Sequence, residues 1–143
     1  MKAVTRLAVI AVAWIVCGRM QAAEEMTLSA VKAAGGKELA GEELKALLPG
    51  KTGRRSVDRY DLNWLHDADG KLRASSVEKT GRMVAWNYPG TWRVSDDGKY
   101  CLRIEWYSGT EQWCRFIAKL GDDYLAFDSR ADDAVAKRKF TLR

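Results

Sequence analysis

Over most of its length the chain alternates apolar and polar residues in short runs, and each run ends in residues that favour a turn. Tyr60, Leu62 and Trp64 alternate with charged or amide side chains, which is typical of a strand with one buried face. Residues 100–106 repeat the alternation directly after the turn residues 95–98. Because Asp-Gly between two such runs indicates a β-hairpin, the chain predicts an antiparallel sheet of consecutive hairpins.

The alternation predicts seven or eight strands joined mainly by tight turns. They are expected at residues 60–64, 71–78, 83–86, 92–94, 100–106, 113–120, 124–127 and 140–142. Residues 87–90 are interpreted as a breaker because they contain Pro and Gly. Sheets of this kind avoid exposed edges by curling. The predicted fold is therefore mostly β (α+β), an antiparallel meander curled into a small barrel or strongly bent sheet, with a flat two-layer sandwich as the alternative.

One short helix is expected ahead of the strands, at residues 41–48. Acidic residues occupy its first turn, three leucines form its apolar face, and Pro49-Gly50 ends it. A helix of two turns is not stable alone, so its leucines are expected to dock on the sheet. Residues 23–40 are expected to form a flexible or partly helical arm before a single β-rich domain at 41–143.

The first 22 residues resemble a secretory signal peptide. Two basic residues flank an apolar run at residues 7–17, and small residues follow at Ala22 and Ala23, the three-part secretory pattern. The run is shorter than the about 20 residues of a membrane span, so no transmembrane span is expected in the mature chain. Cleavage after Ala22 or Ala23 is expected, with an uncleaved anchor or lipidation at Cys17 as alternatives. The protein is therefore expected to be periplasmic or secreted.

Removal of this leader leaves a nearly neutral domain. Without Lys2, Arg6 and Arg19 the net charge falls from +5 to +2. Nucleic-acid binding depends on concentrated Lys and Arg, so no nucleic-acid partner is expected. Two remaining basic groups could touch an anionic surface but are interpreted as solvated faces: Lys51, Arg54 and Arg55 in the first, and residues 137–139 in the second.

Two cysteines, Cys101 and Cys114, remain in the mature chain. In an oxidising compartment they are expected to form a disulfide. The alternation, however, places Cys101 on a polar face and Cys114 in phase with Phe116 and Ala118, which are expected to point inward. Bridged cysteines on neighbouring strands share a face, with Cα atoms within about 7 Å. A bulge near residues 111–112 is therefore predicted together with the disulfide.

Residues that could carry catalysis or bind a metal are few. His66 is the only histidine, and no nucleophile motif such as Gly-x-Ser-x-Gly accompanies it, so it is interpreted as a solvent-facing turn residue. Asp67-x-Asp69-Gly70 shares part of a calcium-loop pattern but lacks the first acidic ligand and the final glutamate. It is therefore interpreted as a turn. A non-enzymatic protein without a metal or a cofactor is expected.

Aromatic residues are abundant for so short a domain. The chain has six tryptophans and five tyrosines, and only Trp14 lies in the leader. These residues favour strands and bury large areas, so core packing is their ordinary role. Ligand pockets also have aromatic walls, so some are expected to line a cavity or a partner-binding face. The candidates are Tyr60, Trp64, Trp92, Trp106, Tyr107 and Trp113.

The segment Gly-Thr-Trp-Arg-Val-Ser-Asp-Asp-Gly at residues 90–98, followed by Cys101 and then Trp113-Cys114, resembles the core of a group of small exported bacterial proteins of unknown function. Members carry a signal peptide and a Leu-rich element that ends near a glycine, as residues 47–50 do. The resemblance covers about residues 42–127. It implies a β-rich periplasmic domain with a disulfide, and it implies no activity and no site residues.

Export, the aromatic residues and the lack of a recognisable catalytic set together favour a non-enzymatic envelope protein. The leading hypothesis is a module that binds a small apolar ligand or a protein partner through its β scaffold. One alternative is an inhibitor of a cell-wall-degrading enzyme of the lysozyme type. A hydrolase with an unrecognised pair of carboxylates is another, because the separation of such a pair is spatial and not visible in sequence.

Overall fold

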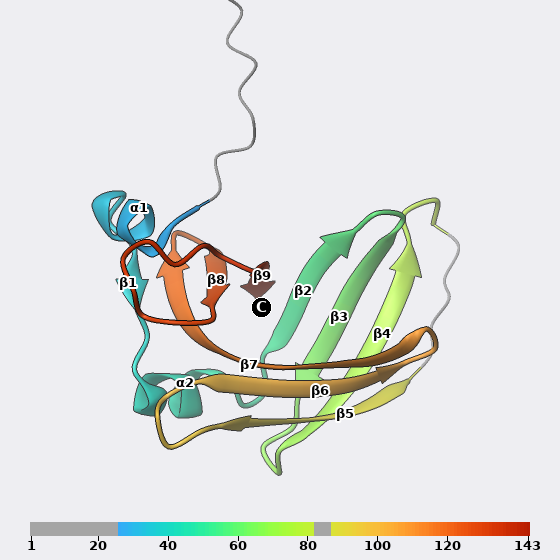
Figure 1. The fold of residues 1–143 in the computed structure, drawn as a ribbon. Coiled ribbons are helices and arrows are strands. Elements are labelled where there is room, and N and C mark those ends of the chain that lie inside the picture. The colour runs from blue at the N-terminus through green and yellow to red at the C-terminus, as the bar shows by residue number, and fades with distance from the viewer. Residues whose placement is uncertain (1–25, 82–86) are drawn as a thin grey trace, which may run out of the picture.

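Eight antiparallel strands close into a barrel (Figure 1). The computed structural model describes residues 26–81 and 87–143. The strands pair in the order β7-β6-β5-β4-β3-β2-β9-β8, and β8 pairs with β7 to complete the ring. The predicted barrel is confirmed, and the flat sandwich is wrong. The strands are β2 (Thr52–Val57), β3 (Tyr60–His66), β4 (Lys71–Glu78), β5 (Tyr88–Val94), β6 (Tyr100–Trp106), β7 (Gly109–Leu120), β8 (Asp123–Phe127) and β9 (Arg138–Leu142).

Helix α2 (Gly41–Leu47) covers one end of the barrel, called here the α2 end. The Glu43 carboxylate accepts a hydrogen bond from the Ala40 backbone N–H at 2.7 Å, which satisfies one of the free donors at a helix start. Leu44 and Leu48 are each 1% exposed and belong to the core inside the barrel. The predicted helix and its docking through leucines are therefore confirmed.

The N-terminal segment packs on the outside of the barrel. Thr27 caps α1 (Leu28–Ala33) by accepting a hydrogen bond from the Ala30 N–H. β1 (Lys37–Glu38) pairs with β7. Because Leu28 and Val31 are buried, α1 forms a second apolar cluster against the outer faces of β7 and β8. Its buried members are Leu28, Val31, Ala118, Leu125 and Phe127.

Two strands differ from the predicted elements. β5 includes residues 88–90, which were interpreted as a breaker. Pro89 has no N–H to donate, but it pairs with β4 opposite Arg73 at a point before the pairing with β6 begins at Gly90. β2 was not predicted, because its sequence Thr-Gly-Arg-Arg-Ser-Val does not alternate clearly. The strand expected at residues 83–86 lies outside the described residues.

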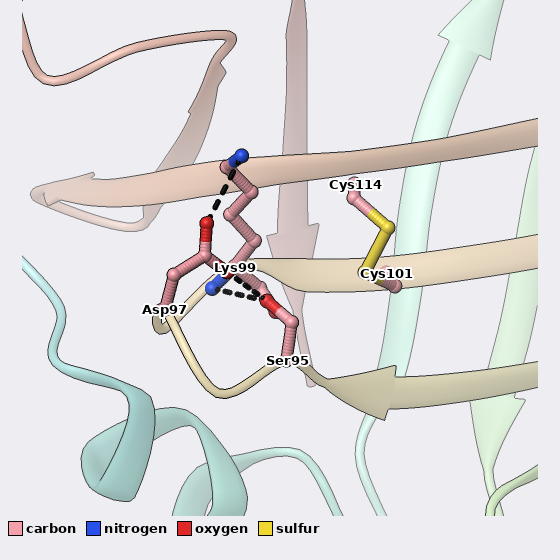
Figure 2. The surroundings of a disulfide bond; sticks show 5 residues. All are labelled: Ser95, Asp97, Lys99, Cys101 and Cys114. Atoms are coloured by element: carbon pink, nitrogen blue, oxygen red, sulfur yellow. Dashed lines mark hydrogen bonds and ion pairs between the residues drawn. A yellow bond between two sulfur atoms is a disulfide. The ribbon is translucent and has the colours of Figure 1, made fainter.

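The β6–β7 hairpin pairs without interruption from Tyr100 opposite Arg115 to Trp106 opposite Gly109. Within this register Cys101 and Cys114 lie directly opposite each other, with Cα atoms 4.0 Å apart, and form a disulfide (Figure 2). The predicted disulfide is therefore confirmed. The predicted bulge near residues 111–112 is wrong.

The phase of β7 explains this error. Its inward face carries Glu111 and Arg115, which are charged, whereas its outer face carries Phe116, which is apolar. Two cations cover the Phe116 ring, with Lys99 Nζ at 5.1 Å and the Arg130 guanidinium carbon at 4.4 Å from its centroid. Charge inside and an aromatic ring outside reverse the phase that hydrophobicity alone predicts.

The turn before β6 holds the hairpin beside the disulfide (Figure 2). The Lys99 backbone N–H donates to Ser95 Oγ at 3.0 Å, and Lys99 Nζ pairs with Asp97 at 3.1 Å. Gly98 adopts a φ of 86°, which is strained for residues with a side chain. The Asp-Gly hairpin predicted at this turn is confirmed by the antiparallel pairing of β5 with β6.

Candidate functional site

Hydrogen bonds join three inward-facing side chains at the α2 end. His66 Nδ1 lies 2.6 Å from the Lys51 carbonyl oxygen, and His66 Nε2 lies 2.7 Å from the Tyr100 hydroxyl. Because a carbonyl only accepts, Nδ1 carries the hydrogen and Nε2 accepts from Tyr100. The Tyr100 hydroxyl in turn accepts from Trp64 Nε1 at 3.2 Å. Each donor in this series of hydrogen bonds therefore has one acceptor.

His66 is fully buried, with 0% exposure. The interpretation as a solvent-facing turn residue is wrong, because the alternation that turns Trp64 inward also turns His66 inward. Burial lowers the pKa of His66 below its ordinary value, although the hydrogen bond to Lys51 opposes this. The ring is therefore neutral inside the core, where it connects β3 to β6.

A cavity of about 660 Å³ lies at the opposite end of the barrel, called here the open end. Its volume falls in the range of small-molecule sites. The Tyr88 and Trp106 rings meet edge to face in its wall, with centroids 5.2 Å apart. Most of the wall is aromatic or aliphatic, and Arg55 and Glu111 supply charge. The lining residues are Arg55, Val57, Tyr60, Leu62, Ser76, Tyr88, Trp106, Tyr107, Ser108 and Glu111.

The Glu111 carboxylate is held by three donors inside the barrel. Its Oε1 accepts from Trp113 Nε1 at 2.9 Å. Its Oε2 accepts from Trp106 Nε1 at 2.9 Å and from Arg55 Nη2 at 3.0 Å. Burial raises the pKa of Glu111. This effect is outweighed by the hydrogen bond from Trp113, the charge of Arg55 and the hydrogen bond from Trp106, so the pKa of Glu111 lies below its ordinary value. Glu111 is therefore ionised at neutral pH.

Arg55 and Glu111 face each other across a gap in the barrel wall. Among residues 26–81 and 87–143, β2 pairs with β9 only up to Arg54, and residues 109–115 of β7 pair only with β6. The wall between residues 55–57 and 109–115 therefore lacks backbone hydrogen bonds, and this gap is called here the seam. The Arg55–Glu111 ion pair spans it, with both side chains less than a fifth exposed.

Basic residues gather on the β2–β9 side of the seam. A second hollow, of about 930 Å³, lies between these two strands. Arg138 of β9 borders it, and its Nε lies 4.0 Å from Glu111 Oε1. Six cations and three carboxylates line this basic groove: Arg54, Arg55, Lys137, Arg138, Lys139 and Arg143, with Asp58, Asp61 and Asp123.

The interpretation of the two basic groups as solvated faces is wrong for Arg55. Its side chain is 14% exposed because Gly53, Arg55 and Val57 share the inward face of β2, opposite Trp64, Leu62 and Tyr60 of β3 in turn. Arg138 shares a face with Ala126 of the core. Its side chain is 44% exposed yet reaches Glu111. Both arginines therefore belong to the candidate site.

The six aromatic candidates separate into three groups. Tyr60 and Trp106 line the cavity, and Trp113 holds Glu111 beside it. Trp64 and Trp92 contact His66 and its partners at the α2 end. Tyr107 is 95% exposed at the turn after β6, at the rim of the cavity. Sequence reasoning missed Glu111 as a site residue, and it named Arg55 and Arg138 only in basic groups that it interpreted as solvated faces. One signal was present for Glu111, since it alternates in phase with Trp113 on a strand.

In the part of the chain that the structure describes, no three His, Cys, Asp or Glu side chains lie close enough to hold a metal ion. Across the same residues, none of the helices has the length and apolar character of a membrane span. No known protein family, curated protein or solved structure matches the chain.

Proposed function

We propose that the protein is a non-enzymatic binding module that takes a small, largely apolar ligand into the cavity at the open end. The observation that supports this most is the wall of that cavity, where Leu62, Tyr88 and Trp106 from three strands surround a volume of about 660 Å³. Binding would cover apolar surface that is now open to water, which is favourable. Rigid strands position these side chains, so the site is formed before the ligand arrives.

The compartment proposed for this module is the periplasm or the exterior of the cell. The Cys101–Cys114 disulfide supports this, because structural disulfides persist mainly in oxidising compartments. The expected leader at residues 1–22 supports the same compartment from the sequence. A carrier or receptor for a poorly soluble molecule fits this compartment, since such a molecule needs a protected apolar site between membranes or outside the cell.

Titration with N-phenyl-1-naphthylamine, a neutral apolar dye, tests the proposal. We expect saturable dye fluorescence with one dye per folded protein. Trp106→Ala should weaken the affinity about tenfold, as for a central aromatic contact. Phe116→Leu is the matched control, because the Phe116 ring lies on the outer face and its replacement should leave dye affinity unchanged. Dye fluorescence that rises without saturation on folded protein would contradict a defined site.

Tyr107 favours a second candidate, a protein partner at the open end. A tyrosine that is 95% exposed at a hairpin tip is an unusual surface residue and a typical contact in protein interfaces. An inhibitor of a lysozyme-type enzyme would be one such binder. If this is correct, the protein should slow lysis of cell walls by a lysozyme, and Tyr107→Ala should restore the lysis rate. An unchanged lysis rate with the intact protein would rule out this inhibitor role.

A further inference from the structure

Four donor side chains gather around the Glu111 carboxylate: Trp106, Trp113, Arg55 and Arg138. Trp106, Trp113 and Arg55 already donate to its two oxygens. The Arg55 Nε is buried and has no hydrogen-bond partner within the described residues. Arg138 Nε approaches Glu111 only to 4.0 Å. Two guanidinium groups thus share one carboxylate, so positive charge exceeds negative charge among these three side chains beside the seam.

We propose that the ligand is an amphiphile with an anionic head group, a carboxylate or a phosphate, on a single apolar tail. The head lies against Arg55 and Arg138, and the tail lies along Tyr88 and Trp106 in the cavity. This inference rests on the proposed function and adds the chemical class of the ligand. It follows from the placement of the two hollows. Aromatic and aliphatic side chains of β3, β5 and β6 line the cavity, and the basic groove between β2 and β9 adjoins it at Arg55 and Val57, which line both.

Arginine is suited to this role. Its planar guanidinium donates two parallel hydrogen bonds to a carboxylate or phosphate, and such charge-assisted bonds are stronger than neutral ones. A head group at Arg55 and Arg138 would supply acceptors for guanidinium N–H groups that do not bond to Glu111. The cations of the basic groove, among them Lys137 and Arg143, add a positive potential beside the seam, which attracts anions toward it.

Displacement of the bound dye by ligands that differ only in the head group tests this inference. We expect dodecanoate and dodecyl phosphate to bind about tenfold more tightly than dodecanol, the gain typical of one hydrogen bond to a charged group. Arg55→Met and Arg138→Met should each reduce this preference. Arg103→Met is the control, because Arg103 is an outer-face arginine paired with Glu105, and it should keep the wild-type preference.

Arg55→Met alone leaves the Glu111 carboxylate buried without its ion-pair partner, which could destabilise the fold. A double variant avoids this cost. Arg55→Met combined with Glu111→Gln removes both charges. We expect this variant to bind the neutral dye and to prefer dodecanoate over dodecanol less than the wild type does, because only Arg138 remains to contact the head group. Circular dichroism would confirm that it is folded. A double variant that keeps the wild-type preference for dodecanoate would overturn the inference.

The outcomes separate the inference from the proposed function. If wild-type protein binds the dye but does not distinguish dodecanoate from dodecanol, the inference fails and the apolar site stands. If neither the dye nor any amphiphile binds, the proposed function fails and the inference with it. Sedimentation with vesicles of anionic phospholipid identifies the source of the head group. Arg55-dependent vesicle binding indicates a membrane lipid, and binding of free dodecanoate alone indicates a soluble amphiphile, both of which support the inference.

Discussion

At the scale of single residues, His66 shows how one buried polar side chain organises the α2 end. Its two ring nitrogens connect the Lys51 backbone to the Tyr100 hydroxyl, and Trp92 packs edge to face against the ring at 5.4 Å between centroids. Burying a polar group is costly unless it is hydrogen-bonded. Both nitrogens of the neutral ring have partners, so protonation of Nε2 would leave the Tyr100 hydroxyl hydrogen without this acceptor.

This arrangement predicts a pH dependence of stability. Burial lowers the pKa of His66 below 6.5, so between that lowered pKa and 6.5 the unfolded chain binds more protons than the folded one. The free energy of unfolding should therefore fall as the pH drops through 6.5, and this contribution should level off below the lowered pKa. Urea unfolding followed by tryptophan fluorescence, from pH 8 to pH 5, measures it.

His66→Gln is the control for this prediction, since His66 is the only histidine. At pH 8 the variant should be less stable by about 1–3 kcal/mol, because the Tyr100 hydroxyl loses a well-placed acceptor. Between pH 7 and pH 6 the variant should lose less stability than the wild type. Parallel curves for the two proteins in that interval would show that folding does not lower the pKa of His66.

At the scale of elements, the β6–β7 hairpin carries Trp106, Glu111 and Trp113 of the candidate site on its inner face and the disulfide on its outer face. Cys101 and Cys114 are separated by 13 residues in sequence. A covalent link between them restricts the unfolded chain more than the folded hairpin, where the two strands are already paired. The disulfide is therefore expected to stabilise the fold without shaping the cavity.

Replacement of both cysteines, Cys101→Ala with Cys114→Ala, should lower the free energy of unfolding by about 3 kcal/mol, the chain-entropy value for a loop of this size. Dye affinity of the folded variant should stay unchanged. Urea unfolding with and without dithiothreitol measures the first effect, and the reductant should destabilise only the wild type. A variant as stable as the wild type would contradict this prediction.

Strands were predictable where one face is apolar and the other is polar. Tyr60, Leu62 and Trp64 revealed β3, and the Asp-Gly turn revealed the start of β6. β2 was hidden because its inward residues are Gly53, Arg55 and Val57, which differ in size and charge. Hydrophobicity does not indicate that a charged residue points inward when its partner lies on a strand far away in the sequence.

At the scale of the whole molecule, the barrel has a filled end and a hollow end. Leu44, Leu48 and the aromatic cluster around Tyr100 fill the α2 end, while the cavity and the ion pairs occupy the open end. The closed meander followed from the number of hairpins and the lengths of the turns. Tyr60, Trp106 and Trp113 of the candidate site were among the aromatic residues predicted. The charged part was not predicted, because it depends on Arg55, Glu111 and Arg138 meeting across a closure between strands from distant parts of the chain.

The seam has a consequence for how copies of this protein behave in a crowded solution. A strand edge without a neighbour can recruit a strand of another molecule, which is a common start of aggregation, and natural sheets resist this with charged side chains that point inward at the edge. Arg55 on β2, and Glu111 and Arg115 on β7, are such side chains. Apolar residues in their place would fill the barrel better but would leave two strand edges that can pair with another molecule. The same charges that make the candidate site therefore also oppose edge-to-edge association.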